Sequence, residues 1–538
     1  MSRSHALAGA VLLALLAGGP LPAQVTFSPQ SAEASSLERL YRLAGLSFPV
    51  AGYPVSALSL ERYAGQLGER LRDPFLAAAL DAWRSAQDYR PGALEIGIEA
   101  RFSLEGYLRA GSPWEDFAHE YLEREPLGEL TLSWSRKDKA AFVIQAFLRR
   151  EYLGVPAWNL PGATSGNPVA LENRQVSKGY FWYDFQPLQL ELGRDVVHFG
   201  PLRSSLLPSD RLPFMDLLRL TLPLGRLTMD FMVSSLENAE ALEEKAAGVN
   251  PDPNGLGFSF AEDGVPGVTV ILANLHRFEY DFGRLRAAVT GLGIFVRKNN
   301  AFALADFFPV SSWHATQYRP FNLSLVFDLD AALFPGFRVM TQFGLDDVNA
   351  SDLFGVGDAP IPTIPAAIAG AEYRRRFPRG ELELYAELGY THYLWGNFDD
   401  ESRAILARAI YRLFLDGGTR LMPLTSPYGP GAIWGNLEAG WCWRTGLYAG
   451  LSAELVFRNP DVDLVHTPYT KDAAAGALAN KTGTLKLGLL ARWPPWKWLE
   501  VYARPTLTVG PGAPALEVVL GGTAVSDWRR NVRRGSPR

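Results

Sequence analysis

The sequence has little cysteine and no excess of positive charge. Cys442 is the only cysteine among 538 residues, so no disulfide can form within the chain. Sparing use of cysteine fits export into an oxidising cell envelope. The net charge is −5, whereas a nucleic-acid-binding domain is expected to be basic. We therefore expect neither a disulfide framework nor a nucleic-acid partner.

Long apolar runs are missing after residue 24. A membrane-spanning helix needs about 18 apolar residues, and no later run reaches that length. The one apolar run, residues 6–17, follows Arg3 and His5 and ends at the Gly18-Gly19-Pro20 break. Ala23 offers a small residue for cleavage, so residues 1–24 are predicted to be a signal peptide. If the mature chain crosses a membrane, it does so as strands.

Motifs for catalysis and metal binding are missing too. His119-Glu120 lacks the second histidine of a zinc protease, and no Gly-x-Ser-x-Gly or phosphate-binding Gly-Lys-Ser/Thr occurs. The stretch Asp347-Val-Asn-Ala-Ser lacks the glycine and the later glutamate of a calcium loop. We expect a protein that is not an enzyme and holds no metal or cofactor.

Residues 25–90 show the 3.6-residue period of helices. Gly45 and Pro49 end the first predicted helix, Ser59 caps the second, and Asp73-Pro74 starts the third. The apolar faces comprise Leu37, Leu40, Tyr41 and Ala44; Leu60, Tyr63, Leu67 and Leu71; and Phe75, Ala79, Leu80 and Trp83. These helices are too charged to span lipid, so we predict a small periplasmic helical bundle ahead of the next domain.

After Pro91 the period changes to two, as in residues 95–102, 129–135, 381–388 and 484–490. Short connections, at 223–225, 281–283, 334–336, 378–380 and 444–446, alternate with long ones at 235–273, 297–317, 346–366, 393–432 and 459–482. This alternation is typical of outer-membrane barrels, which have tight periplasmic turns and long external loops.

Strands are predicted to begin near residues 93, 127, 139, 178, 188, 214, 226, 274, 284, 318, 337, 367, 381, 433, 446, 483, 498 and 515. The fold class is therefore an all-β transmembrane antiparallel β-barrel of about eighteen strands over residues 91–524, in the outer membrane of a bacterium with two membranes. We expect proline only at strand ends, as at Pro187 and Pro320. Residues 525–538, basic and without an apolar pattern, are predicted to be a disordered tail. The chain does not end on an aromatic residue, unlike many bacterial barrels.

Aromatic residues cluster at Tyr180-Phe-Trp-Tyr, Trp441-Cys-Trp and Trp493-Pro-Pro-Trp-Lys-Trp. Such clusters serve either as platforms on which sugar rings stack or as the aromatic girdle at the lipid–water interface. We favour the girdle, because all three lie at predicted strand ends or turns.

One stretch resembles a known family. Gly193-Arg194, Phe199-Gly200-Pro201, Ser205-Leu-Leu-Pro-Ser209 and Pro213-Phe214 follow the pattern of the Wzi-type capsule-assembly barrels. Phe199 replaces an expected tryptophan and Leu202 an expected glycine. The specific motif covers about forty residues. The resemblance implies an eighteen-stranded barrel with helices at its periplasmic end, which binds or anchors surface or capsular polysaccharide in a lectin-like way.

Candidate binding residues come from this motif and from the expected polar lumen: Arg194, His198, Phe199, Ser209, Asp210 and Arg211. Arg194 and Arg211 either clamp the carboxylates of an acidic glycan or pair with Asp195 and Asp210, and we favour the pairing. Gly200-Pro201 and Pro208 indicate an ordered segment folded inward, whose simplest role is to plug the pore.

Three functions remain open at this stage. The first is a polysaccharide-binding barrel, probed by loss of surface glycan in a deletion strain. The second is a porin for small solutes, probed by conductance in planar bilayers. The third, least favoured, is a barrel enzyme acting on lipid or envelope glycan. We expect the partners to be outer-membrane lipid and polysaccharide, and the barrel to be a monomer.

Overall fold

The structure is a computed structural model that describes residues 26–29, 31–87, 94–111, 125–136, 138–150, 171–172, 176–252, 255, 257–261, 269–298, 321–347, 363–397, 405–415, 418–469 and 481–532. The predicted signal peptide, the His119-Glu120 pair and most of the calcium-like stretch lie outside these residues. In the described part of the chain, no helix is long and apolar enough to cross a membrane.

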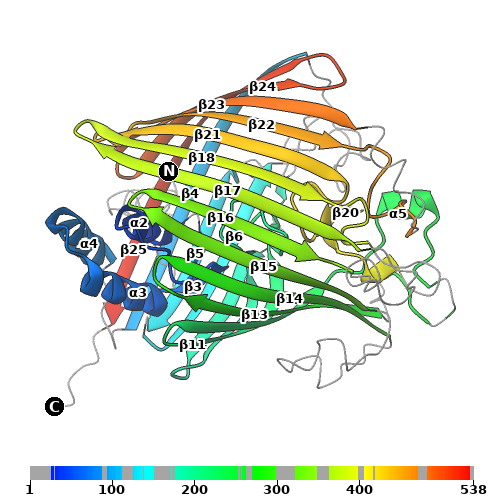
Figure 1. The fold of residues 1–538 in the computed structure, drawn as a ribbon, viewed down its shortest axis with the longest axis horizontal. Coiled ribbons are helices and arrows are strands. Elements are labelled where there is room, and N and C mark those ends of the chain that lie inside the picture. The colour runs from blue at the N-terminus through cyan, green and yellow to red at the C-terminus, as the bar shows by residue number, and fades with distance from the viewer. Residues whose placement is uncertain are drawn as a thin grey trace, which may run out of the picture.

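The described strands form a closed antiparallel barrel (Figure 1). Its eighteen wall strands are β4 (Leu94–Ala110), β5 (Gly128–Arg136), β6 (Ala140–Arg150), β8 (Val176–Asp184), β9 (Gln189–Asp195), β11 (Met215–Leu224), β12 (Leu227–Leu236), β13 (Thr269–Asp281), β14 (Leu285–Lys298), β15 (Phe321–Phe334), β16 (Phe337–Leu345), β17 (Pro365–Phe377), β18 (Gly380–Thr391), β21 (Ala432–Trp443), β22 (Tyr448–Arg458), β23 (Thr482–Trp496), β24 (Leu499–Val509) and β25 (Ala515–Val532). β25 pairs with β4 and closes the wall, while β7 (Leu171–Glu172) extends the edge of β6. The predicted strand count is confirmed, and every predicted strand start falls within five residues of the observed one.

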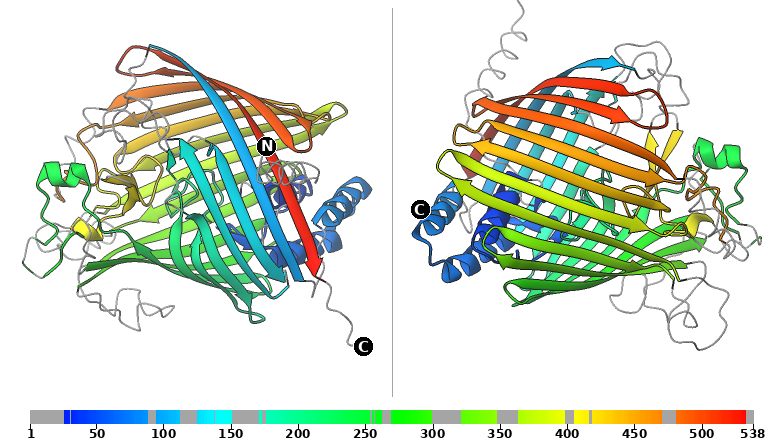
Figure 2. Two further views of the ribbon diagram at one scale, coloured as in Figure 1. Left: turned by 180° about the vertical axis from the view of Figure 1, so that it is seen from behind. Right: turned by 45° about the horizontal axis from the view of Figure 1, so that its top comes forward.

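The barrel has two unlike ends. At one, which we call the short-turn end, the wall strands are joined by two to four residues; the other we call the long-loop end. Gly336 shows why these turns need glycine: its φ is +83°, and an added Cβ would lie 2.2 Å from the carbonyl oxygen of Arg374. An even number of strands places both barrel termini, Leu94 and Val532, together at the short-turn end (Figure 2).

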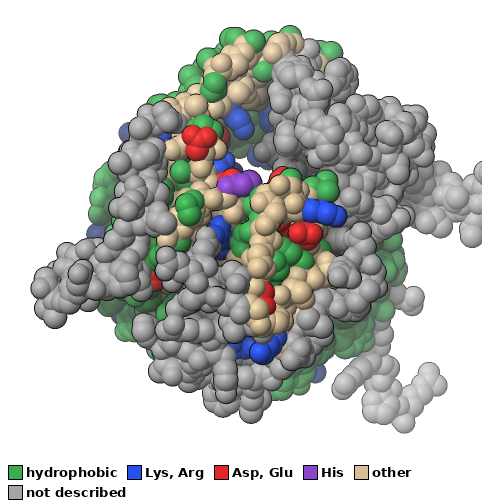
Figure 3. Space-filling model, turned by 90° about the vertical axis from the view of Figure 1, so that its right-hand side faces the viewer, with side chains coloured by type: hydrophobic (Ala, Val, Ile, Leu, Met, Phe, Trp, Pro, Cys, Tyr) green, Lys and Arg blue, Asp and Glu red, His purple; other side chains and the backbone are tan. Residues whose placement is uncertain are grey.

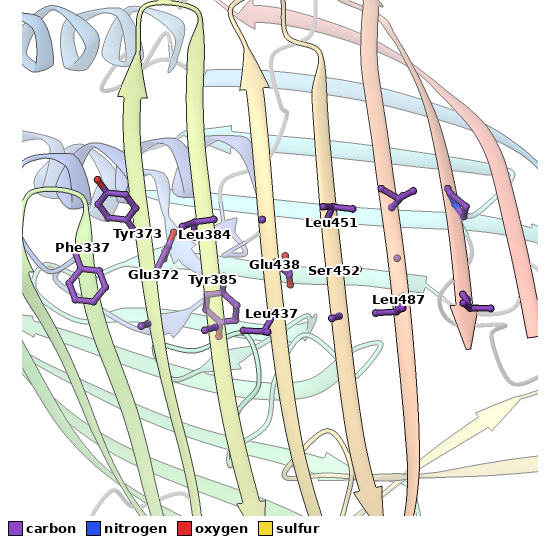
Figure 4. A pocket seen from close by; sticks show the side chains of 18 of the residues that line it. Phe337, Glu372, Tyr373, Leu384, Tyr385, Leu437, Glu438, Leu451, Ser452 and Leu487 are labelled. Atoms are coloured by element: carbon purple, nitrogen blue, oxygen red, sulfur yellow. The ribbon is translucent and has the colours of Figure 1, made fainter. Parts of the chain in front are cut away.

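The wall alternates between an apolar outer face and a polar inner face. Figure 4 shows this on adjacent strands, where Leu384, Leu437 and Leu451 point away from their neighbours Tyr385, Glu438 and Ser452. The outward leucines are widely exposed, for example Leu388 at 69% and Leu437 at 60%. A continuous apolar belt of this kind is unfavourable in water and is stabilised by lipid. The protein is therefore a transmembrane barrel.

Outward aromatic side chains gather near the short-turn end. Phe181, Trp443, Trp493 and Trp496 are all more than a third exposed, and each lies near a short turn. This is the position of an aromatic girdle at a membrane interface, as predicted for these clusters. Trp182, however, points inward and is buried, so it offers no face to a sugar.

Three helices lie at the short-turn end: α2 (Ala32–Leu43), α3 (Ala57–Arg70) and α4 (Pro74–Gln87) (Figure 1). They share an apolar core of their own, and β1 (Thr26–Phe27) pairs with β3 (Val55–Ser56) beside it. The backbone of this segment bonds to the turns of the wall, since Ser47 N donates to Gly283 O and Gly336 N to Arg42 O, both at 2.9 Å. The segment closes the mouth of the barrel rather than standing ahead of it.

Details of two helices differ from the prediction. The second helix is capped by Ser56, not Ser59, because the Ser56 hydroxyl accepts the Ser59 amide at 3.2 Å. Phe75 is 52% exposed, because α4 turns Leu76 and Trp83 to the core instead. The start of α4 at Pro74 is as predicted, with the Asp73 carboxylate accepting from the Phe75 amide at 2.9 Å.

Two predictions about the end of the chain are wrong. β25 continues to Val532 and pairs with β4 over that length, so residues 525–532 are strand rather than disordered tail. The strand continues because the backbone N–H and C=O groups along the edge of β4 need hydrogen-bond partners, and residues 525–532 supply them whatever their side chains are. Residues 533–538 lie outside the described residues. Proline also occurs inside a strand, at Pro505 in β24, where the pairing with β23 is interrupted between Thr506 and Ala503.

Candidate functional site

The chain between β9 and β11 folds into the lumen. It leaves the wall at Asp195, forms β10 (His198–Phe199), and rejoins the wall at Met215. β10 pairs with β2 (Gly52–Tyr53) of the N-terminal segment, so two distant parts of the chain form one small sheet inside the barrel. We call residues 196–214 the inward segment. Most of its side chains are buried, as the sequence motif predicted.

Glycines on both sides let the inward segment approach the wall. Gly200 has φ +125°, and an added Cβ there would lie 2.2 Å from the Gln342 side-chain amide. Gln342 in turn accepts the Leu206 amide at 2.9 Å. On β17, a Cβ at Gly370 would lie 2.5 Å from Leu202. These close contacts fix the segment against the inner wall.

A long loop covers the inward segment from the long-loop end. The loop between β18 and β21 carries the hairpin β19 (Ile410–Leu415) and β20 (Gly418–Pro423) and the short helix η3 (Ile405–Ala407). The Tyr411 hydroxyl donates to Phe214 O at 2.8 Å, and the Ser426 amide to Ser205 O at 3.0 Å. Beside it, Arg412 forms a fully buried ion pair with Glu244 of α5 (Leu242–Ala247) at 2.6 Å. Together these segments form an apolar core within the lumen.

From the short-turn end, α2 docks on the wall through ion pairs. Arg42 pairs with Glu372 of β17, and Glu38 with Arg338 of β16 at 3.1 Å. Glu372 also accepts from Arg338 at 2.8 Å and from Arg374 at 2.5 Å. A third pair joins Arg39 to Glu381. Ordered chain therefore enters the lumen from both ends and fills part of it.

A chamber of about 720 Å³ lies between α2, the inward segment and the wall. We call it the arginine chamber. It is lined by seven arginines and three carboxylates, together with two tyrosines and one histidine: Arg42, Arg203, Arg211, Arg286, Arg338, Arg374, Arg504, Glu38, Asp210, Glu372, Tyr53, Tyr385 and His198. Its wall is therefore polar and mainly cationic.

Three of the six predicted site residues, His198, Asp210 and Arg211, line the chamber. The His198 ring bonds to the Asp210 carboxylate through Nδ1 and to Leu202 O through Nε2, both at 3.0 Å. Both partners are acceptors, so the ring satisfies them together when it is protonated. Burial lowers the pKa of His198, but the Asp210 carboxylate and the hydrogen bonds outweigh burial, and the pKa lies above its usual value of 6.5.

The other three predicted residues do not meet the chamber. Arg194 pairs with Asp216 through two bonds of 2.6 and 2.8 Å and lies on Phe214; Asp195 pairs instead with Lys178. The two predicted pairings, Arg194 with Asp195 and Arg211 with Asp210, are thus replaced by others. Phe199 and Ser209 are buried, and Phe199 packs in the lumen core, where no ligand reaches its ring.

The sequence reasoning missed Tyr53 and Arg504. Arg504 had a usable signal, since it alternates with outward Pro505 and so faces the lumen on β24. Tyr53 had none, because it reaches the lumen through the unforeseen pairing of β2 with β10.

One side of the lumen is not packed by described residues. Glu438, which contacts the inward segment, pairs with Ser452, and Ser452 with Gly488, so these positions all face inward. On these strands the inward Ser452, Lys486 and Arg492 are exposed. Figure 3 shows the long-loop end hollowed where no grey atoms cover it, with basic side chains on its inner wall.

The outer wall carries a second cavity, an apolar groove of about 830 Å³ across β16 to β25. Leucines such as Leu437 and Leu487 form its sides (Figure 4). It lies on the face of the apolar belt.

Neither a protein-family profile nor a curated protein matches the sequence. Among solved structures, the chain is similar to Wzi of Escherichia coli, described as an outer-membrane protein involved in group 1 capsule assembly and a carbohydrate-binding β-barrel. The two share the fold. The TM-score is 0.57, with 12% sequence identity over 91% of this chain and 97% of Wzi. The Wzi-type resemblance of the sequence motif is confirmed at this level.

Other solved structures also match, with lower scores. OccK9 of Pseudomonas aeruginosa covers 81% of this chain and 98% of its own at 12% identity and TM-score 0.41. OccAB4 of Acinetobacter baumannii covers 82% and 100% at 11% identity and TM-score 0.42. These scores are too low to indicate a shared fold.

Proposed function

We propose that this protein is a non-catalytic outer-membrane barrel that binds or anchors surface polysaccharide. The observation that carries the proposal is the partly filled lumen: ordered chain enters it from both ends and lines a polar chamber against the wall. A rigid site with polar donors fixed by packing is suited to holding a ligand. The similarity in fold to Wzi, a carbohydrate-binding barrel, supports the same function.

The orientation follows from the two ends. Bacterial barrels keep tight turns in the periplasm and long loops outside the cell. We therefore place α2, α3 and α4 on the periplasmic side, and the loop that carries β19 and β20 at the cell surface. Residues 1–24 are then removed on export through the inner membrane.

A porin-like channel for small solutes is the second candidate. The exposed inner faces of β22 and β23, with Lys486 and Arg492, favour it, because described residues leave this part of the inner wall uncovered. In porins, a polar inner wall lines the channel that conducts ions.

Two measurements on the purified, detergent-solubilised protein separate these functions. Envelope polysaccharide is titrated against the immobilised barrel, and the same preparation is inserted into planar bilayers. Saturable binding with little or no steady conductance is the result expected of a glycan-binding plugged barrel. Steady conductance without polysaccharide binding would replace the proposed function by the porin.

A further inference from the structure

We propose that the arginine chamber binds the carboxylate groups of an acidic saccharide. This rests on the proposed function and names the class of glycan that the lumen accepts. The chamber lies between the N-terminal segment and the inward segment. The helices of the N-terminal segment lie at the short-turn end of the barrel (Figure 1).

Two of the lining cations have no carboxylate partner among the described residues. Arg211 projects from the inward segment and is exposed, with its guanidinium 5.7 Å from the Tyr428 ring. Arg504 projects from β24 and is half-buried. The remaining five arginines of the chamber all form ion pairs. The chamber thus presents two free guanidinium groups from two different elements.

Buried hydrogen-bond donors that lack an acceptor also favour a negatively charged ligand. The Tyr53 side chain is 3% exposed and lines the chamber, yet its hydroxyl has no hydrogen-bond partner among the described residues. Within the same described part of the chain, the buried Nε of Arg42 has no acceptor either. An unpaired buried donor destabilises the folded protein, and an acceptor on an incoming ligand removes that penalty.

The carboxylates of the chamber, by contrast, are occupied. Glu372 contacts three arginines, Asp210 bonds to His198, and Glu38 pairs with Arg42 and Arg338. A cationic ligand would find no free carboxylate, whereas an anionic ligand finds free donors. Guanidinium groups bind carboxylates through paired, charge-assisted hydrogen bonds.

The volume fits a short saccharide. At about 720 Å³ the chamber is within the size range of small-molecule sites. Its polar wall offers hydrogen-bond partners for the hydroxyl groups of a sugar. Uronic acids carry both a carboxylate and the hydroxyl groups of a sugar, so they fit both features of the chamber.

The test is isothermal titration of the full-length protein in neutral detergent with three probes: a short oligogalacturonate, a neutral malto-oligosaccharide of equal length, and inorganic phosphate. The variants are Arg211→Gln, Arg504→Gln, their combination, and Tyr53→Phe, which keeps the ring. Arg492→Gln is the matched control, because Arg492 faces the lumen but does not line the chamber. Heat-dependent mobility on gels verifies that each variant is folded.

We expect oligogalacturonate to bind, the neutral sugar to bind at least about tenfold more weakly, and affinity to fall as salt rises. Each arginine variant should weaken oligogalacturonate about tenfold or more, as for other hydrogen bonds to charged groups, while Arg492→Gln should have little effect. Equal binding of acidic and neutral sugars by all variants would overturn the chamber assignment and leave glycan binding intact. Binding of phosphate alone, sensitive to the same variants, would assign the chamber to phosphoryl groups and overturn the saccharide. No saccharide binding by folded protein would overturn both.

Discussion

Glu372 is the carboxylate on which the docking of α2 depends, so Glu372→Gln is the most informative single change. The residue is buried and contacts Arg42, Arg338 and Arg374. Removing one partner of a buried ion pair typically costs about 3–5 kcal/mol. Arg42 keeps a second partner, Glu38, at 2.5 Å, so we take the lower end, about 3 kcal/mol. That is roughly a hundredfold increase in the equilibrium for opening of α2.

Hydrogen exchange of the α2 amides in detergent, followed by mass spectrometry, measures that equilibrium directly. Glu381→Gln is the control, because among the described residues Glu381 holds α2 through Arg39 alone, and Arg39 is 37% exposed and is hydrated when the pair is lost. We expect the exchange of α2 to accelerate far more in Glu372→Gln than in the control. Equal acceleration in the two variants would refute the idea that burial of the Glu372 pairs holds the helix in the barrel.

Three further predictions concern the plug and the orientation. Because the pKa of His198 is raised in the folded state above 6.5, its stabilisation of the inward segment is complete below about pH 6.5 and is lost as pH rises through the folded pKa. The protection of residues 198–212 from exchange, relative to the intrinsic rate at each pH, should therefore fall at high pH, and His198→Gln should remove this fall. Gly370→Val overpacks the contact with Leu202, at a typical cost of about 1–3 kcal/mol in stability. Bilayer conductance should therefore rise in this variant but not in the control Gly106→Ala. Unchanged conductance in Gly370→Val would show that this contact does not hold the inward segment in place. Cys442 faces the lumen near the short-turn end; a bulky water-soluble maleimide should label it in permeabilised cells, and labelling in intact cells would reverse the proposed orientation.

The barrel wall could be predicted closely because its pattern is local. Each strand alternates lipid-facing and lumen-facing residues, and most of the short turns between strands contain a glycine or a proline. The local sequence therefore indicates the register and direction of each strand. Predictions failed where a partner distant in sequence decides the structure. The β4 edge keeps residues 525–532 in a strand despite Arg529 and Arg530, and packing on the helix core turned Phe75 outward.

The candidate site could be predicted only in part, for the same reason. The Gly200-Pro201 step indicated the inward segment, and His198, Asp210 and Arg211 do line the chamber. The opposite wall of the chamber comes from α2 and β24, more than 100 residues away on either side, and no local pattern joins them. Arg194 belongs to the same motif, but the alternation of side chains along β9 places it on the opposite face from Asp195, where it forms an ion pair with Asp216.

The most direct test of the central claim, that this barrel holds polysaccharide at the cell surface, is the partition of glycan between cells and medium in a deletion strain. We expect surface polysaccharide to move from the cells to the medium, and the wild-type gene to restore its attachment. Glycan that stays on the cells to the same extent without the protein would contradict the claim.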